Sequence, residues 1–152
     1  MNSNEQFLKG GFIPLLKQLS DNEVGLWGVL SPQGMIEHMT DAFANAYGKI
    51  KLPAQTPEAI LLKVREFALS ETPFKENTKN VLMSEEPAPL RNNNITEAIW
   101  ELEIEIIAFM EYYKSNPDSI NLNPFFGDFN FEEWLHLLNK HAKHHLKQFN
   151  LL

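Results

Sequence analysis

The stretch Phe131–Phe149, FEEWLHLLNKHAKHHLKQF, decides the fold expected for this chain. On a helical wheel at about 100° per residue, its apolar side chains fall on one stripe, made of Phe131, Trp134, Leu135, Leu138, Ala142, Leu146 and Phe149. His141 and His145 lie inside this stripe, whereas Lys140, Lys143 and Lys147 lie on the opposite face. Because a helix buries its apolar stripe against other elements, we expect both histidines to point into the core.

The spacing of the two histidines suggests a metal site. Residues four apart on a helix project from the same face, so His141 and His145 are placed to bind one cation. The spacing alone is a weak indication, because such pairs are more often ordinary core or solvated histidines. A third histidine, His38, lies on the inward edge of another expected helix. We therefore predict that His38, His141 and His145 bind one divalent cation, for which zinc, nickel and iron all suit nitrogen ligands.

Three further long helices are expected upstream. The first covers about residues 4–19, where Gly10-Gly11 and Pro14 predict either a kink or a later start of the helix. The second runs from Ser31-Pro32, a cap and first-turn pair, to about residue 49. The third begins at Asn94, which forms a capping pattern with Glu97, and ends before Pro117. Asn130 and Glu133 repeat this capping pattern at the start of the last helix.

The long connection between the second and third helices, residues 50–94, contains one short helix capped by Thr56-Pro57. The sequence shows no sustained alternation of the kind typical of strands. The pattern predicts a single all-α domain spanning residues 1–152, folded as a four-helix bundle with a long crossover connection.

Composition narrows the classes of partner. The net charge of −7 disfavours binding to nucleic acid or to an anionic membrane. The chain has no cysteine, which excludes disulfides and thiolate ligands and leaves histidines and carboxylates to bind a metal. The first residues, Met1-Asn2-Ser3-Asn4-Glu5-Gln6, lack the basic and apolar regions of a signal peptide, and no apolar run approaches about 18 residues, so we expect a cytoplasmic protein.

The other titratable residues have less definite roles. We expect His136 to be solvated, since it falls on the lysine face, and His144 to be a partly exposed structural histidine at the border of the stripe. Asp41 lies one turn after the second-helix histidine and is placed to reach its ring. Glu103 is a candidate fourth ligand or general base, although an exposed glutamate is favoured. The Glu101-Glu103-Glu105 alternation otherwise predicts a solvated helix face.

Several segments resemble one family. They are Asn123-Pro124-Phe125-Phe126-Gly127, Glu133-Trp134, His141-x-x-His144-His145-Leu146-x-Gln148-Phe149 and, upstream, Trp27-Gly28 with Gln33-Gly34-Met35-Ile36-Glu37-His38-Met39. Together they are similar to the DinB/YfiT-like superfamily, and closest to a branch of short bacterial proteins of uncharacterised function. The resemblance covers most of the chain but little of residues 50–94.

The resemblance implies a four-helix bundle with a divalent metal held by one histidine of the second helix and two of the last, which are His38, His141 and His145 here. It also implies a low-molecular-weight thiol as a cofactor in some members, which are thiol-dependent transferases or isomerases. Fold does not fix the reaction.

Two classes of function stay open. One is a metal-dependent enzyme acting on a small molecule, either a hydrolase or a low-molecular-weight-thiol transferase. The other is a non-catalytic bundle that binds a metal or a partner. An open coordination position at the three histidines would favour the enzyme.

Large apolar side chains also suggest a homodimer. They are Trp27, Trp100, Phe125 and Phe126. An equally weighted alternative is that the long connection, residues 50–94, covers these side chains.

Overall fold

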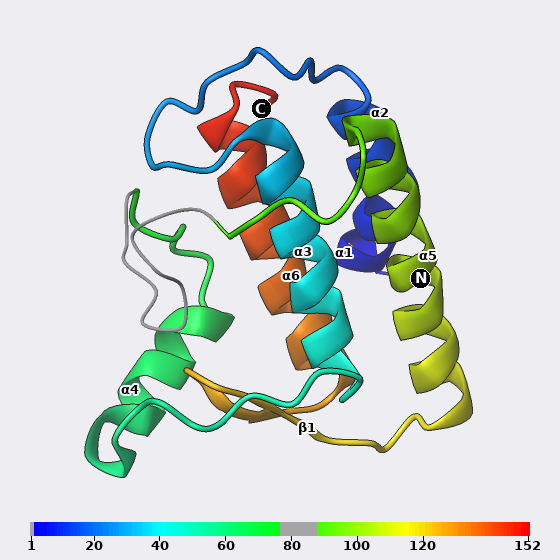
Figure 1. Ribbon diagram of the computed structural model, residues 1–152. Coiled ribbons are helices and arrows are strands. Elements are labelled where there is room, and N and C mark those ends of the chain that lie inside the picture. Colours follow the sequence, from blue (N-terminus) through cyan, green and yellow to red (C-terminus); the bar gives the residue numbers. More distant parts are fainter. Residues whose placement is uncertain (1, 77–87) are drawn as a thin grey trace.

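The computed structural model describes residues 2–76 and 88–152, and these residues are mainly helical. The helices α3 (Pro32–Ala46), α5 (Ile95–Ser115) and α6 (Phe131–Gln148) lie alongside one another, and an N-terminal helical segment runs beside α5 (Figure 1). No helix within these residues is long and apolar enough to cross a membrane. The expected all-α class is therefore confirmed for the described part of the chain.

The N-terminal segment is helical but irregular. It consists of α1 (Ser3–Gln6), a π-helical turn η1 (Phe7–Gly11) and α2 (Phe12–Leu16). A π turn takes up one extra residue and is a common way for a helix to accommodate a break in its hydrogen bonding. The ring of Phe7 lies against Gly11, where an added Cβ would come within 2.9 Å of the ring. The irregularity expected from Gly10-Gly11 and Pro14 is confirmed, and the helix ends three residues earlier than expected.

The three long helices begin where their capping residues predict. The side chains of Ser31, Asn94 and Asn130 each accept a hydrogen bond from a backbone N–H three residues later. At α6 the Glu133 carboxylate also accepts from the Asn130 N–H, which completes a capping box. At α5 only half of the predicted box forms, because the Glu97 carboxylate accepts from the Asn93 N–H instead. These caps fix the register in which each apolar stripe faces the core.

One continuous hydrophobic core joins the N-terminal segment, α3, α5 and α6. Its largest fully buried side chains include Trp134, Tyr113, Phe12, Phe43, Phe109 and Phe129. The prediction that Glu105 lies on a solvated face of α5 is wrong, because Glu105 is buried. Its carboxylate accepts hydrogen bonds from the Tyr47 hydroxyl and from Lys49 Nζ, the latter at 2.8 Å. Burial and this carboxylate raise the pKa of Tyr47. A buried carboxylate with two donors is tolerated because its charge is paired.

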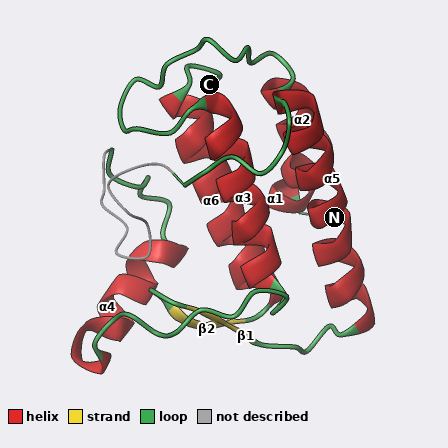
Figure 2. Ribbon diagram, viewed as in Figure 1, coloured by secondary structure: helices red, strands yellow, loops and turns green. Residues whose placement is uncertain are grey.

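A short hairpin was missed by the sequence reasoning. Strands β1 (Asn121–Asn123) and β2 (Gly127–Phe129) pair antiparallel at the base of the molecule, beside α4 (Glu58–Leu69) (Figure 2). Three residues per strand are too few to show an alternating pattern.

Helix α4 begins without the cap predicted for it. Thr56 does not cap α4, because its hydroxyl donates to the Phe125 carbonyl. Pro57 occupies the N-cap position, where no side chain accepts a hydrogen bond from the first turn. The Thr56 hydrogen bond ties the start of α4 to the hairpin turn instead.

Candidate metal site

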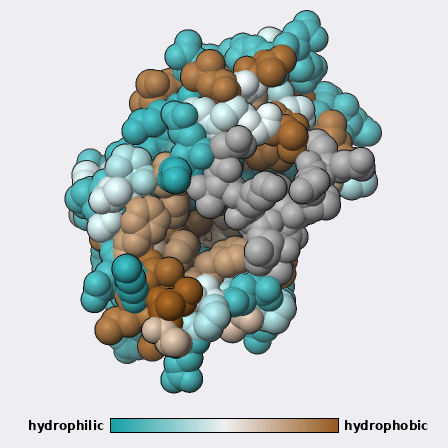
Figure 3. Space-filling view, turned by 90° about the vertical axis from the view of Figure 1, so that its left-hand side faces the viewer, coloured by the Kyte–Doolittle hydropathy of each residue, from teal (hydrophilic) through white to brown (hydrophobic). Residues whose placement is uncertain are grey.

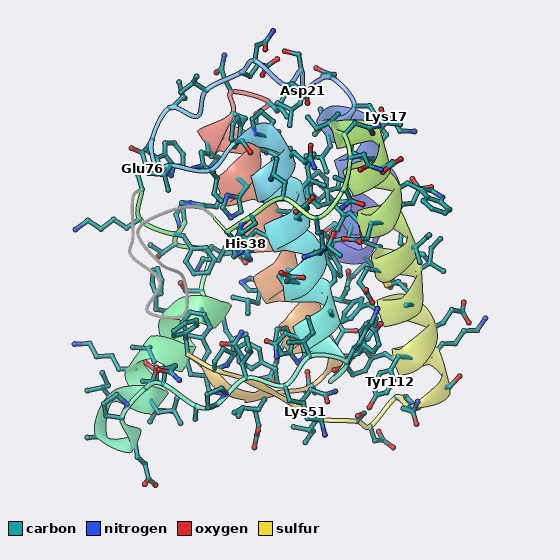
Figure 4. All side chains as sticks on the ribbon, in the orientation of Figure 1. Lys17, Asp21, His38, Lys51, Glu76 and Tyr112 are labelled. Carbon is teal, nitrogen blue, oxygen red and sulfur yellow. The ribbon has the colours of Figure 1, made fainter. Side chains whose placement is uncertain are left out.

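Helices α3 and α6 bring three histidines together. His38 projects from the middle of α3 (Figure 4), while His141 and His145 lie one turn apart on α6. His141 Nε2 lies 3.1 Å from His38 Nε2 and 2.9 Å from His145 Nε2. One ring nitrogen from each of the three residues lies within 4.8 Å of the other two. The prediction that these three residues converge is therefore confirmed.

The geometry fits one cation better than it fits hydrogen bonding among the rings. A neutral imidazole carries one N–H and one lone pair. His141 Nε2 has two close nitrogen neighbours, and a single proton can serve only one of those contacts. Two nitrogens bound to a tetrahedral zinc ion at 2.0–2.1 Å stand about 3.3 Å apart, so small ring movements would admit the ion.

Burial keeps the three imidazoles neutral. Burial, and then the neighbouring His145 and His38, lower the pKa of His141 well below 6.5. Burial, helped by the nearby His38, lowers the pKa of His145 to about 3. Burial also lowers the pKa of His38, although Asp41 opposes this. Neutral imidazoles are the form that binds metals, so the site is prepared for a cation at neutral pH. Protons would compete with a metal for ordinary histidines below about pH 6.5, and these lowered pKa values move that competition to a lower pH.

The three histidines differ in exposure. His145 is buried, with an exposed fraction of 6%, whereas His38 and His141 are only partly buried. No other histidine or carboxylate of the described residues joins the cluster. Three protein ligands with one partly exposed side are the arrangement found in metal sites that keep a coordination position for another group.

An aromatic wall borders the histidines. The ring of Phe74, in the segment after α4, lies 6.2 Å from that of His141 and 6.0 Å from that of His144, and the Trp27 ring lies 5.3 Å from His144. Phe74 also stacks against Phe126 at 6.3 Å. Hydrophobic side chains gather beside a hollow on this face of the molecule (Figure 3). The sequence reasoning missed Phe74, which carries no motif.

Lys143 and Lys147 on the lysine face of α6 are exposed, as expected, but His136 and Lys140 on the same face contact the C-terminal end of α4. His136 Nε2 lies 2.9 Å from the Ser70 carbonyl oxygen, and Lys140 Nζ donates to the Phe67 carbonyl at 2.7 Å. The Lys140 ammonium group also lies over the rings of Phe67 and Phe74. The prediction that His136 is solvated is therefore wrong. Polar side chains at this position satisfy carbonyls that the end of a helix leaves free.

The carboxylates proposed as helpers do not reach the histidines. Asp41 pairs with the Arg91 guanidinium at 3.0 Å, and Glu103 is exposed on α5, as the favoured alternative predicted. Arg91 is paired with Glu101 as well. None of these carboxylates belongs to the three-histidine cluster.

The residue before His38 fixes the chain that leads into α5. The buried Glu37 carboxylate accepts hydrogen bonds from the backbone N–H groups of Arg91 and Asn92, each at 3.0 Å. Burial opposes its ionisation, but these donors and Gln33 outweigh burial and lower the pKa of Glu37. Segment 88–94 is thereby held across α3 (Figure 1).

Comparisons with known proteins identify no relative. The chain matches no family model, no curated protein and no solved structure. The site must therefore be interpreted from its own geometry.

Proposed function

We propose that this protein is a DinB-like four-helix bundle in which His38, His141 and His145 bind one divalent cation, either zinc, nickel or iron. The observation that carries the proposal is the convergence of three neutral Nε2 atoms at 2.9 and 3.1 Å around His141. The side-by-side arrangement of α3, α5, α6 and the N-terminal segment supports the bundle. The cytoplasmic location stays a prediction.

We propose further that the site is that of a metal-dependent enzyme acting on a small molecule, as a hydrolase or as a low-molecular-weight-thiol transferase. When bound, the cation would act as a Lewis acid toward a carbonyl, a water or a thiol. His38 and His141, which are partly exposed, would leave one side of the cation accessible, and Phe74 and Trp27 would limit the access of water.

One observation favours the non-catalytic alternative. Asp41 is held by Arg91, and no carboxylate of the described residues joins the three histidines. The described part of the site thus offers no carboxylate as a general base. A non-catalytic metal-binding bundle would need no such group.

The metal content of protein purified without a histidine tag tests the proposal. We expect one equivalent of a divalent metal per chain, bound tightly enough to survive dialysis. Metal-loaded protein is then assayed for ester and amide hydrolysis, and for transfer of a panel of low-molecular-weight thiols to electrophiles. The same protein stripped by a chelator is the control. A protein that takes up no zinc, nickel or iron refutes the site, and one that binds metal without activity in either assay favours the non-catalytic alternative.

A homodimer stays a prediction, and we propose an exposed face of α5 as its surface. Trp100, Ile104 and Ile107 have exposed fractions of 67%, 48% and 57%, and they follow one another along a single face of α5. Phe126 is half-buried against Phe74, so it is a weaker candidate than Trp100. We expect sedimentation at high micromolar concentration to show a dimer and Trp100→Glu to give a monomer, because a buried charge opposes association. A wild-type protein that is only monomeric would count against the dimer.

A further inference from the structure

Gln148 links the metal site to the loop before α3. Its side-chain Oε1 lies 2.7 Å from His145 Nδ1, and its Nε2 donates to the Trp27 carbonyl at 2.9 Å. Its backbone carbonyl accepts a hydrogen bond from the Leu26 N–H at 2.7 Å. Gln148 is buried, with an exposed fraction of 3%. The amide therefore has a defined partner on each side.

These partners determine which way the amide faces. A backbone carbonyl can only accept a hydrogen bond, so the NH₂ group of Gln148 must face Trp27. Its oxygen must then face His145, where it can only accept. His145 Nδ1 must therefore carry the ring proton. It follows that His145 Nε2, the atom beside His141, carries a lone pair.

The loop is shaped around this amide. A Cβ added at Gly28 would lie 2.9 Å from Gln148 Nε2, and one added at Gly25 would lie 3.2 Å from Gln148 Cγ. Gly28 also has a φ of +76°, a conformation that favours glycine. The two glycines let the backbone come close enough for the Trp27 carbonyl to hold the Gln148 amide in one orientation.

We propose that Gln148 is a positioning residue, which keeps the proton of His145 on Nδ1 and so leaves Nε2 free for a cation. The proposal rests on the proposed metal site. Outer partners that fix the tautomer of a ligating histidine commonly change metal affinity by about 10–100-fold. In the sequence, Gln148 stands out only as part of the segment that resembles the DinB/YfiT-like superfamily. The signal that could have identified it is a carboxamide three residues after a ligand histidine, on the same face of the helix.

The direct test is ¹⁵N nuclear magnetic resonance of the His145 ring in metal-free wild-type protein at neutral pH. We expect the proton on Nδ1. A proton on Nε2 would overturn the proposal without reference to any variant. This measurement is independent of metal binding, so it separates failure of this inference from failure of the metal site.

Two substitutions then test the consequence for binding, with Zn²⁺ alone titrated against a chromophoric chelator. Gln148→Leu removes the acceptor, and we expect Zn²⁺ affinity to fall by about 10–100-fold as the His145 proton moves to Nε2. Gln148→Glu keeps an acceptor for Nδ1–H but loses the donor to Trp27, and we expect it to retain most of the affinity. Equal losses in the two variants would show that Gln148 acts only by holding the loop, and would overturn the proposal.

Asn139→Leu is the matched control. Asn139 is another buried amide of α6, and its Nδ2 has no hydrogen-bond partner among the described residues. Leucine has a similar shape and removes a buried donor that has no partner, so the substitution should cost little stability. We expect Asn139→Leu to bind Zn²⁺ as wild type does. A loss in this variant equal to that in Gln148→Leu would mean that general disturbance of α6 explains both, and would overturn the proposal.

Discussion

Replacing His141 with alanine is expected to abolish tight binding of a divalent cation. His141 Nε2 is the central atom of the cluster, in contact with both other Nε2 atoms, and its loss leaves two imidazoles on different helices. Removing an outer partner already costs about 10–100-fold in affinity, so removing a ligand should cost more than about 100-fold. Titration with Zn²⁺ in competition with a chelator measures the change. His38→Ala and His145→Ala should behave alike.

Two histidines of the same helix are controls for this experiment. His136→Ala removes the contact with the Ser70 carbonyl, and His144→Ala removes a ring packed against Trp27 and Phe74. Neither residue belongs to the three-histidine cluster. Both variants should keep the metal. If His144→Ala loses the metal and His145→Ala keeps it, the phase of α6 is wrong; unchanged binding in the three cluster variants would refute the site.

Mild acid is expected to destabilise the metal-free protein, and His141 and His145 alone account for about 3 kcal/mol between about pH 7.5 and 5.5. His38 and His144, whose pKa values are also lowered, add to the loss in the same pH range. The reason is that the pKa of His141 is well below 6.5 and that of His145 is about 3 in the folded chain. The unfolded chain takes up protons on both residues as the pH falls below 6.5, whereas the folded chain does not. Unfolding is therefore favoured, and each histidine contributes about 1.4 kcal/mol per pH unit below that value.

The direction of the stability change and the pH range in which it occurs identify the buried histidines as its cause. Above about pH 6.5 both states are neutral at these residues and stability should be flat. Glu37 also has a lowered pKa, but it adds its loss only as the pH falls below 4.5. Denaturant midpoints measured in chelator at several pH values give the slope, and His145→Gln should flatten it by about one proton. A slope unchanged in that variant would mean that His145 is not the buried neutral group described here.

The sequence predicted the long helices well because their signals are local. Ser31, Asn94 and Asn130 mark helix starts through hydrogen bonds that span three residues. The hairpin at residues 121–129 depends on a different kind of information. Its strands are held by pairing with each other and by the Trp134 indole, which donates to the Asn121 carbonyl. Such contacts between different elements produce no periodic pattern of apolar residues in the sequence.

The cluster of three histidines was predictable from the sequence, and its surroundings were not. The spacing of His141 and His145 and the inward edge of α3 were enough to select three histidines. The misjudged residues, His136 and Glu105, have partners that are distant in the sequence. His136 meets Ser70, 66 positions away, and Glu105 meets Tyr47, 58 positions away. A helical wheel assigns such residues to a solvated face because it includes only the residues of the helix and not the elements that pack against it.

The separation of His38 and His141 along the chain has a consequence for the order of folding. The two residues lie 103 positions apart and meet only when α3 has docked on α6. Before docking, a cation finds only the adjacent pair on α6, which is a poor site. A metal bound by all three would therefore act as a removable cross-link that closes a loop of about 100 residues, and in the chain-entropy model a permanent link of that span stabilises by about 4.7 kcal/mol. The rate at which Zn²⁺ becomes tightly bound during refolding should then report the docking of these two helices.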